Sequence, residues 1–175
     1  MSSKDKESFT NKAGRFMVFA AWIGVAALLT WFFSDYLDSQ WNPNRSVVSR
    51  ANIDTQTEVV LQRNRYGHYV ASGHINGNPV VFLLDTGATH VSVPERIAAE
   101  IGLQRGAPMQ VSTANGITTV YSTVLQEVQL GNIVLQNVRA DINPHFEQDE
   151  ILLGMAFLKH LEFTQSGDTL TLHGL

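Results

Sequence analysis

The 175-residue sequence contains no cysteine, which excludes disulfide bonds and any chemistry that needs a thiolate. Basic residues are also few, with 12 Lys and Arg against 16 Asp and Glu. From residue 51 onward, six basic residues stand against twelve acidic ones. A nucleic-acid surface needs clustered Lys and Arg, so we expect no nucleic-acid partner.

Motifs for metals and cofactors are missing as well. No phosphate-binding Gly-x-x-x-x-Gly-Lys-Ser/Thr pattern is present, and no motif supports a serine nucleophile. His68 and His74 do not have the spacing of a zinc site. One run of His and acidic residues is more often a solvated loop than a metal site, so we expect no metal and no cofactor. This run comprises His145, Glu147, Asp149 and Glu150.

One long hydrophobic run is present, over residues 16–33, without a single charge. As a helix with a rise of ~1.5 Å per residue it would span roughly 27 Å, close to the hydrocarbon thickness of a bilayer. A cleaved signal peptide and a buried core helix are the alternatives. Residues 34–38 offer no small-residue cleavage site, so we predict an uncleaved transmembrane helix at 16–33.

The charges beside this run predict its orientation. Asp35 and Asp38 come first after it, whereas basic residues precede it, and basic flanks stay in the cytoplasm. We therefore expect residues 1–15 in the cytoplasm and the remaining chain outside the cytoplasmic membrane. The basic residues before the run are Lys4, Lys6, Lys12 and Arg15.

Residues 34–58 show no sustained periodicity, and we predict a linker there. Residues 59–175 are predicted to form a mostly β domain. A helix is expected at 95–101, between Pro94 and Gly102, and a helical turn at 157–161. The predicted strands are 59–61, 66–75, 80–84, 90–93, 127–130, 133–142, 151–153, 162–163 and 169–172, and residues 111–125 are predicted to form a hairpin.

The most informative stretch is Leu-Leu-Asp-Thr-Gly-Ala at residues 83–88, where an apolar strand runs straight into a carboxylate and a turn of small residues. A carboxylate at the end of a buried strand is costly unless it has partners or a function. For Asp-Thr-Gly alone, an Asx-type turn without a function is the plain alternative. The hexapeptide resembles the active-site motif of aspartic proteases in its retroviral form.

Two further motifs extend the resemblance over about residues 66–175. An apolar-apolar-Gly element before a helical segment is similar to the element that supports the Asp loop in these proteases; its residues are Leu152, Leu153 and Gly154. An Asn-Gly hairpin signal lies between the two motifs, in the chain position of the flap; its residues are Thr113, Ala114, Asn115 and Gly116. The chain is most similar to the single-domain, membrane-anchored retropepsin-like aspartic proteases of bacteria.

This resemblance implies an all-β, retropepsin-like acid protease barrel with short helices, one lobe per chain, after one transmembrane helix. It implies an aspartic endopeptidase in which two carboxylates share a proton and activate one water to attack a peptide bond. Because the chain carries a single Asp-Thr-Gly motif, the second Asp85 would come from another copy in a C2 homodimer. Thr86 would bond to the partner loop, Gly87 would bring its N–H close to the carboxylate, and Ala88 would leave room beside it.

The resemblance also implies a Gram-negative cell, with the protease domain in the periplasm. One departure from the retroviral pattern is Met155, where those enzymes usually have an Arg that braces the dimer. We therefore predict that residues 169–172 provide the dimer contact. The alternative function is a catalytically silent, membrane-anchored dimerisation or peptide-binding module on the same fold.

Overall fold

The computed structural model describes residues 3–51, 57–113 and 116–174. The chain divides into two compact units, one ending at Gln40 and one beginning at Trp41. Helix α1 (Ser3–Trp41) forms the first unit and its last residue opens the second. Its part from Gly14 to Trp41 is long and apolar enough to cross a membrane, and none of its most apolar stretch is buried. That exposure disfavours the alternative of a buried core helix.

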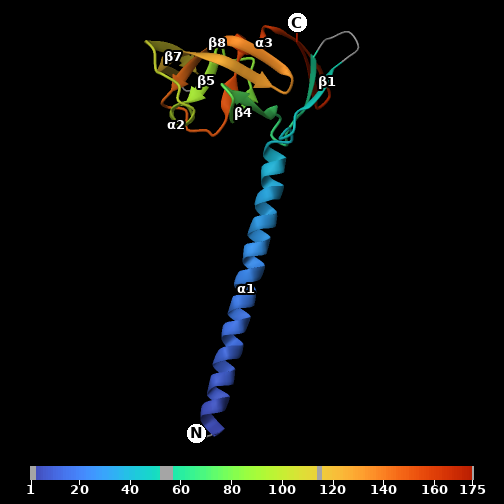
Figure 1. Ribbon diagram of the computed structural model, residues 1–175, viewed down its shortest axis with the longest axis vertical. Coiled ribbons are helices and arrows are strands. Elements are labelled where there is room, and N and C mark those ends of the chain that lie inside the picture. The colour runs from blue at the N-terminus through green and yellow to red at the C-terminus, as the bar shows by residue number, and fades with distance from the viewer. Residues whose placement is uncertain (1–2, 52–56, 114–115, 175) are drawn as a thin grey trace. The chain divides into compact units, whose positions relative to one another are not determined.

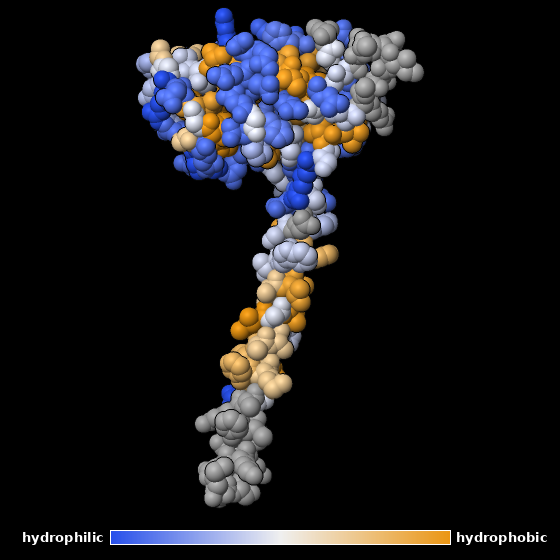
Figure 2. Space-filling view, in the orientation of Figure 1, coloured by the Kyte–Doolittle hydropathy of each residue, from blue (hydrophilic) through white to orange (hydrophobic). Residues whose placement is uncertain are grey.

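Two hydroxyl groups in the membrane-length part of α1 bond within the helix. The Thr30 hydroxyl donates to the Ala26 carbonyl, and the Ser34 hydroxyl donates to the Thr30 carbonyl, each at 2.8 Å. Because each hydroxyl donates to a carbonyl of the preceding turn, neither would be left without a hydrogen-bond partner in a hydrocarbon environment. Apolar side chains, coloured orange in Figure 2, cover this part of the helix.

The second unit contains two β-sheets (Figure 1). An antiparallel sheet has the order β1 (Val48–Ala51), β2 (Thr57–Gln62), β11 (Thr169–Gly174) and β10 (Leu161–Ser166). A mixed seven-stranded sheet has the order β3 (Val70–Ile75), β4 (Asn78–Leu84), β9 (Ile151–Leu153), β5 (Val91–Pro94), β8 (Ile133–Asn143), β7 (Gly116–Leu130) and β6 (Pro108–Thr113). Two short helices, α2 (Glu95–Glu100) and α3 (Met155–Leu158), follow β5 and β9.

The seven-stranded sheet curls into a barrel because β3 also pairs with β7, at His74↔Gln129 and Ile75↔Val128. Both sheets contribute to one core: Leu61 and Leu172 come from the smaller sheet, and Phe82 comes from the larger. These side chains are fully buried, and their removal from water is the main stabilising contribution to the fold.

The predicted all-β class is confirmed, and most predicted strands agree with the observed ones to within a few residues. The hairpin turn at Asn76 and Gly77 has positive φ at both residues, 51° and 79°, as a type I′ turn requires. One difference lies at Gln126, where a break was predicted but β7 runs on as one 15-residue strand. It pairs with β6 at one end and with β8 at the other, so it belongs to two hairpins.

The prediction of a linker over 34–58 is wrong for the residues that the structure describes. Helix α1 continues to Trp41, and β1 pairs with β2. Between these elements Asn44 is only 4% exposed. Its amide nitrogen donates to the carbonyls of Gln62 and Val70, at 2.9 and 2.7 Å, and its side-chain oxygen accepts from the Gln62 N–H at 2.7 Å.

The neighbours of Asn44 are held in the same way. Asn42 is buried, and its side chain accepts from the Asn44 N–H and donates to the Ser72 hydroxyl. The Trp41 indole N–H donates to the carboxylate of Glu150, which immediately precedes β9. We call residues 41–44 the entry clamp. Its polar side chains produce no hydrophobic periodicity, which is why the sequence pattern predicts a linker there.

The structure limits how residues 169–172, the predicted dimer contact, could meet another chain. These residues lie in β11, which pairs with β2 on one side and β10 on the other. A strand with both edges occupied has no backbone groups free for a strand of another chain. In this sheet the outer strands are β1 and β10.

Candidate active site

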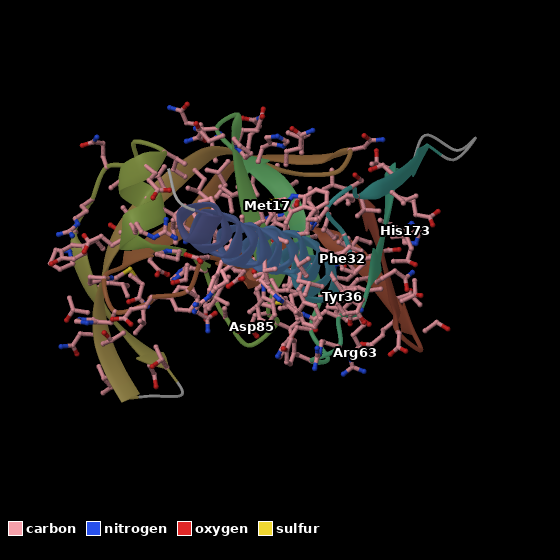
Figure 3. All side chains as sticks on the ribbon, turned by 90° about the horizontal axis from the view of Figure 1, so that it is seen from below. Met17, Phe32, Tyr36, Arg63, Asp85 and His173 are labelled. Atoms are coloured by element: carbon pink, nitrogen blue, oxygen red, sulfur yellow. The ribbon has the colours of Figure 1, made fainter. Side chains whose placement is uncertain are left out.

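The loop between β4 and β5 carries Asp85, and two structural features fix its position (Figure 3). Strand β4 pairs in parallel with β9, with Leu84 opposite Leu153, and the Asp85 N–H donates to the Leu153 carbonyl at 3.2 Å. This strand pair, in which Phe82, Ile151 and Leu153 are buried, therefore ends at Asp85. Asp85 itself is only partly exposed.

Within the loop, two backbone N–H groups bond to Asp85, one to its carboxylate and one to its backbone carbonyl. The Gly87 N–H donates to Asp85 Oδ1 at 2.8 Å, and the Ala88 N–H donates to the Asp85 carbonyl at 3.2 Å. A hydrogen bond to a charged acceptor is stronger than one between neutral groups, so the turn holds the carboxylate in one orientation. Thr86 and Gly87 are exposed at the surface of the single chain.

The apolar-apolar-Gly element lies directly behind this loop. The Met155 N–H donates to the Ala88 carbonyl at 2.8 Å, and the Ala156 N–H donates to the Thr89 carbonyl at 2.9 Å. A Cβ built on Gly154 would lie 2.2 Å from the His90 carbonyl oxygen and 2.5 Å from that of Ala88. Residue 154 must therefore lack a side chain for the two segments to approach this closely. The structure thus brings residues 85–88 and 152–154 together.

The predicted flap corresponds to the tip of the β6–β7 hairpin. Thr113 is opposite Gly116 in the strand register, its hydroxyl donates to the Gly116 carbonyl at 2.8 Å, and Gly116 has φ of 107°. Ala114 and Asn115 lie outside the described residues. The hairpin that the sequence predicts is therefore present in its described part.

Sequence reasoning missed a buried polar cluster behind the loop. Asp141 on β8 is opposite Ser92 on β5, and Asp141 Oδ1 accepts from the Ser92 hydroxyl at 2.7 Å. Asp141 Oδ2 lies 3.7 Å from His90 Nδ1. Burial raises the pKa of the Asp141 carboxyl, while the Ser92 hydrogen bond and the charge of His90 act in the opposite direction. The sequence feature that could have indicated this cluster is Asp141 itself, an acidic residue between the apolar Ala140 and Ile142.

The structure offers no alternative centre based on a metal among its described residues. No group of three or more His, Asp or Glu side chains in ranges 3–51, 57–113 and 116–174 is arranged to hold an ion. In the run around residue 145, Asp149 instead pairs with Arg96, and Glu150 accepts from Trp41. Asp149 and Glu150 thus serve contacts within the domain.

The barrel, the Asp-Thr-Gly loop at the end of a buried strand and the glycine packed behind it define the class of retropepsin-like aspartic proteases. The family model described as "gag-polyprotein putative aspartyl protease" matches residues 71–160, a span that includes Asp85 and Gly154. The chain belongs to this family. The predicted resemblance is thereby confirmed.

Two similar proteins extend this assignment. The crystal structure of a retropepsin-like aspartic protease from Rickettsia conorii superimposes with a TM-score of 0.59 at 24% identity, over 74% of this chain and 96% of that one. This likeness supports the fold. An uncharacterized protein in the cobV 5' region of Sinorhizobium sp is 35% identical over 126 residues, which are 68% of this chain and 54% of that protein. The chain thus matches about half the length of this curated relative.

Proposed function

We propose that the protein is an aspartic endopeptidase whose catalytic carboxylates are two copies of Asp85, one from each subunit of a homodimer. The observation that carries the proposal is the position of Asp85. It follows strand β4, the Gly87 N–H bonds to its carboxylate, and Gly154 packs closely behind its loop. The Gly87 bond alone would also fit an Asx-type turn without a function. The close packing of Gly154 behind the loop and the family match over residues 71–160 favour the catalytic role.

The need for a second copy follows from the chemistry. The reaction requires one ionised carboxylate that takes a proton from water and one protonated carboxylate that donates to the scissile carbonyl oxygen. The chain has one Asp-Thr-Gly motif. A C2 axis beside the loop brings the same loop of both copies to one site, and the exposed Thr86 is then available to the partner loop.

In the mechanism, the ionised Asp85 acts as the general base and the attacking water forms a tetrahedral diol. The protonated Asp85 gives its proton to the carbonyl oxygen in the same step. When the diol breaks down, the Asp85 that took the proton from water passes it to the departing amine nitrogen, the other Asp85 takes a proton back from a diol hydroxyl, and no acyl-enzyme forms. The backbone N–H of Gly87 holds the orientation of the base through its bond to Oδ1. The β6–β7 hairpin, at Thr113–Gly116, would cover the bound peptide and exclude water.

The N-terminal helix supports a further part of the proposal. We propose that residues 16–33 cross the cytoplasmic membrane, that residues 1–15 remain in the cytoplasm, and that the protease domain lies in the periplasm. The support is the exposed apolar surface of α1 over residues 16–33 and the basic residues that precede residue 16. The substrate would then be a peptide or protein on the outer side of that membrane.

The decisive experiment compares the protein with its Asp85→Asn variant on a peptide library. Asn keeps the shape of the side chain and removes its charge, so cleavage should fall to the uncatalysed level while the circular dichroism spectrum stays the same. Asp168→Asn, the same change in the exposed β10–β11 turn, is the matched control and should retain full activity. Cleavage by Asp85→Asn at the wild-type rate would refute the assignment. Inactivity of the wild type toward every peptide would favour the silent module.

A further inference from the structure

The buried carboxylate of Asp141 lies beside the last residue of the Asp85 loop, which comprises residues 85–90. Asp141 is 5% exposed and Ser92 is 9% exposed. One oxygen of Asp141 accepts from Ser92 at 2.7 Å, and the other lies 3.7 Å from Nδ1 of His90. His90 is the last residue of the loop before β5 begins at Val91. These three residues form what we call the Asp141 cluster.

The fold alone does not require a carboxylate at this position. Among the buried side chains of the described residues, Asp141 is the one that carries a charge; the other polar ones are Asn and Ser. Burying a charge is unfavourable, and the pKa of Asp141 is raised accordingly. An Asn at the same position would accept the Ser92 hydrogen bond without that cost. Only the attraction to His90 would be lost.

That attraction acts on the loop that carries Asp85. The near end of the loop is fixed by the Asp85 N–H to Leu153, and its middle by the carbonyls of Ala88 and Thr89, which accept from α3. At its far end, the carbonyl of His90 lies against Gly154, and its side chain faces Asp141. A shift of His90 would therefore move the contact with Gly154 and, through it, the loop.

We propose that Asp141 is a positioning residue for the Asp85 loop, and that it acts through His90 and Ser92. In the described part of the chain, few other titratable groups surround Asp141. The strand pairing places Ser92 of β5 and Ser122 of β7 opposite Asp141, and the His90 imidazole lies 3.7 Å from its carboxylate. Neither serine titrates in the working range of a protein. The electrostatic state of the cluster is therefore set by Asp141 and His90.

The test compares Asp141→Asn with the wild-type protein and with the exposed control Asp168→Asn. The kinetic part rests on the proposed function. In Asp141→Asn, kcat should fall about tenfold with little change in KM, because the carboxylate pair is misplaced rather than the substrate. The second part needs no activity: amide exchange at Met155 and Ala156, which donate to the loop, should accelerate about tenfold.

Thermal stability separates positioning from a structural role. A structural role predicts a lower melting temperature for Asp141→Asn at neutral pH, whereas positioning predicts a loss of kcat without a loss of stability. In a double-mutant cycle, His90→Gln and Asp141→Asn should be non-additive, since both remove the same contact. The amide of Leu172, in the other sheet, is the internal reference for exchange.

Each outcome decides the proposal. Unchanged kcat and unchanged exchange in Asp141→Asn would overturn it and leave the protease assignment intact. A wild type without peptidase activity would end the proposed function, and amide exchange alone would then decide whether Asp141 positions the loop. If Asp141→Asn does not fold, His90→Gln must itself accelerate the exchange of Met155 and Ala156, and its failure to do so would refute the proposal.

Discussion

Gly154 and His90 are in such close contact that a Cβ on the glycine would lie 2.2 Å from the histidine carbonyl oxygen. The atoms on the other side of the contact are backbone, and they cannot rotate away as a flexible side chain could. His90 ends the loop that begins at Asp85, and Gly154 begins the segment that supports it. The Asp85 loop can therefore approach the segment at Gly154 this closely only because residue 154 has no side chain.

We predict that Gly154→Ala nearly abolishes peptide cleavage. The added methyl group must displace the loop, and a small misplacement of catalytic groups reduces the rate on the order of 100-fold. Overpacking should also lower the free energy of unfolding by about 1–3 kcal/mol. The matched control is Gly174→Ala, where the nearest atoms to a new Cβ are 3.9 Å away and activity should persist. Full activity of Gly154→Ala would contradict the role of this contact.

We predict that activity depends on association of two chains. The specific activity of a soluble form that begins at Trp41 should fall on dilution below the dimer dissociation constant, because the active fraction follows mass action. A covalent tandem of two such domains should keep its activity at any dilution, and Asp85→Asn in one half should remove it. A monomer, proven by light scattering, that cleaves peptides at the full rate would exclude the shared site.

We predict that the entry clamp belongs to the folded domain. Asn44→Ala leaves the Gln62 N–H and the Val70 carbonyl without their side-chain partner in a buried setting. It should therefore lower the free energy of unfolding by about 2 kcal/mol or more. Denaturant unfolding measures this loss, with Asn132→Ala, at an exposed position, as the control.

A truncation gives an independent measure of the same contribution. A chain that begins at Trp41 should unfold cooperatively, whereas one that begins at Arg45 keeps β1 but lacks Asn42 and Asn44 and should be less stable. Equal stability of the two chains would show that the clamp contributes little to the fold.

We predict that ionisation of Asp141 destabilises the fold at neutral pH. Because its pKa is raised by burial, the folded state binds the proton more readily than the unfolded state. The stability that protonation provides is present below the ordinary Asp pKa of 3.8 and is lost as the pH rises through the raised value. Asp141→Asn should match the wild type at acidic pH and exceed its melting temperature increasingly toward neutral pH. A difference that is independent of pH would contradict this sign.

We predict that the protease domain lies outside the cytoplasmic membrane. A protease added to intact spheroplasts should digest the chain beyond residue 34 and leave residues 1–15 protected. Immunodetection of tags at both ends measures this. Protection of the domain until lysis would reverse the predicted orientation.

The parts of the fold that the sequence predicts are those with local causes. Asn76 and Gly77 form a hairpin because their own backbone preferences allow positive φ. The Asp85 loop is recognisable because an apolar strand, a carboxylate and small residues follow one another directly. Alternating or apolar runs mark the strands whose side chains enter the core, such as Phe82 and Leu153.

The parts that the sequence does not predict depend on partners far along the chain. Asn44 is buried because Gln62 and Val70 supply its hydrogen bonds, and Asp141 is buried because Ser92 and His90 face it. Neither partnership leaves a periodic pattern. The central place of β11 likewise follows from its pairing with β2, more than 100 residues earlier in the chain. Long-range pairing has no local signature.

Because β7 continues from the β6–β7 hairpin into the barrel, it determines how the base of the hairpin is held. From Tyr121 to Leu130 it is paired with β8, while from Gly116 to Tyr121 it is paired with β6. The base of the hairpin, at the fully buried Val120, is therefore held in the barrel, and only the tip projects from it. Because the base of the hairpin is paired with β8, we expect the hairpin to open by bending along its length rather than by rotation about a hinge. Its stiffness, and with it the access of a peptide to Asp85, would then be set by the residues of two paired strands.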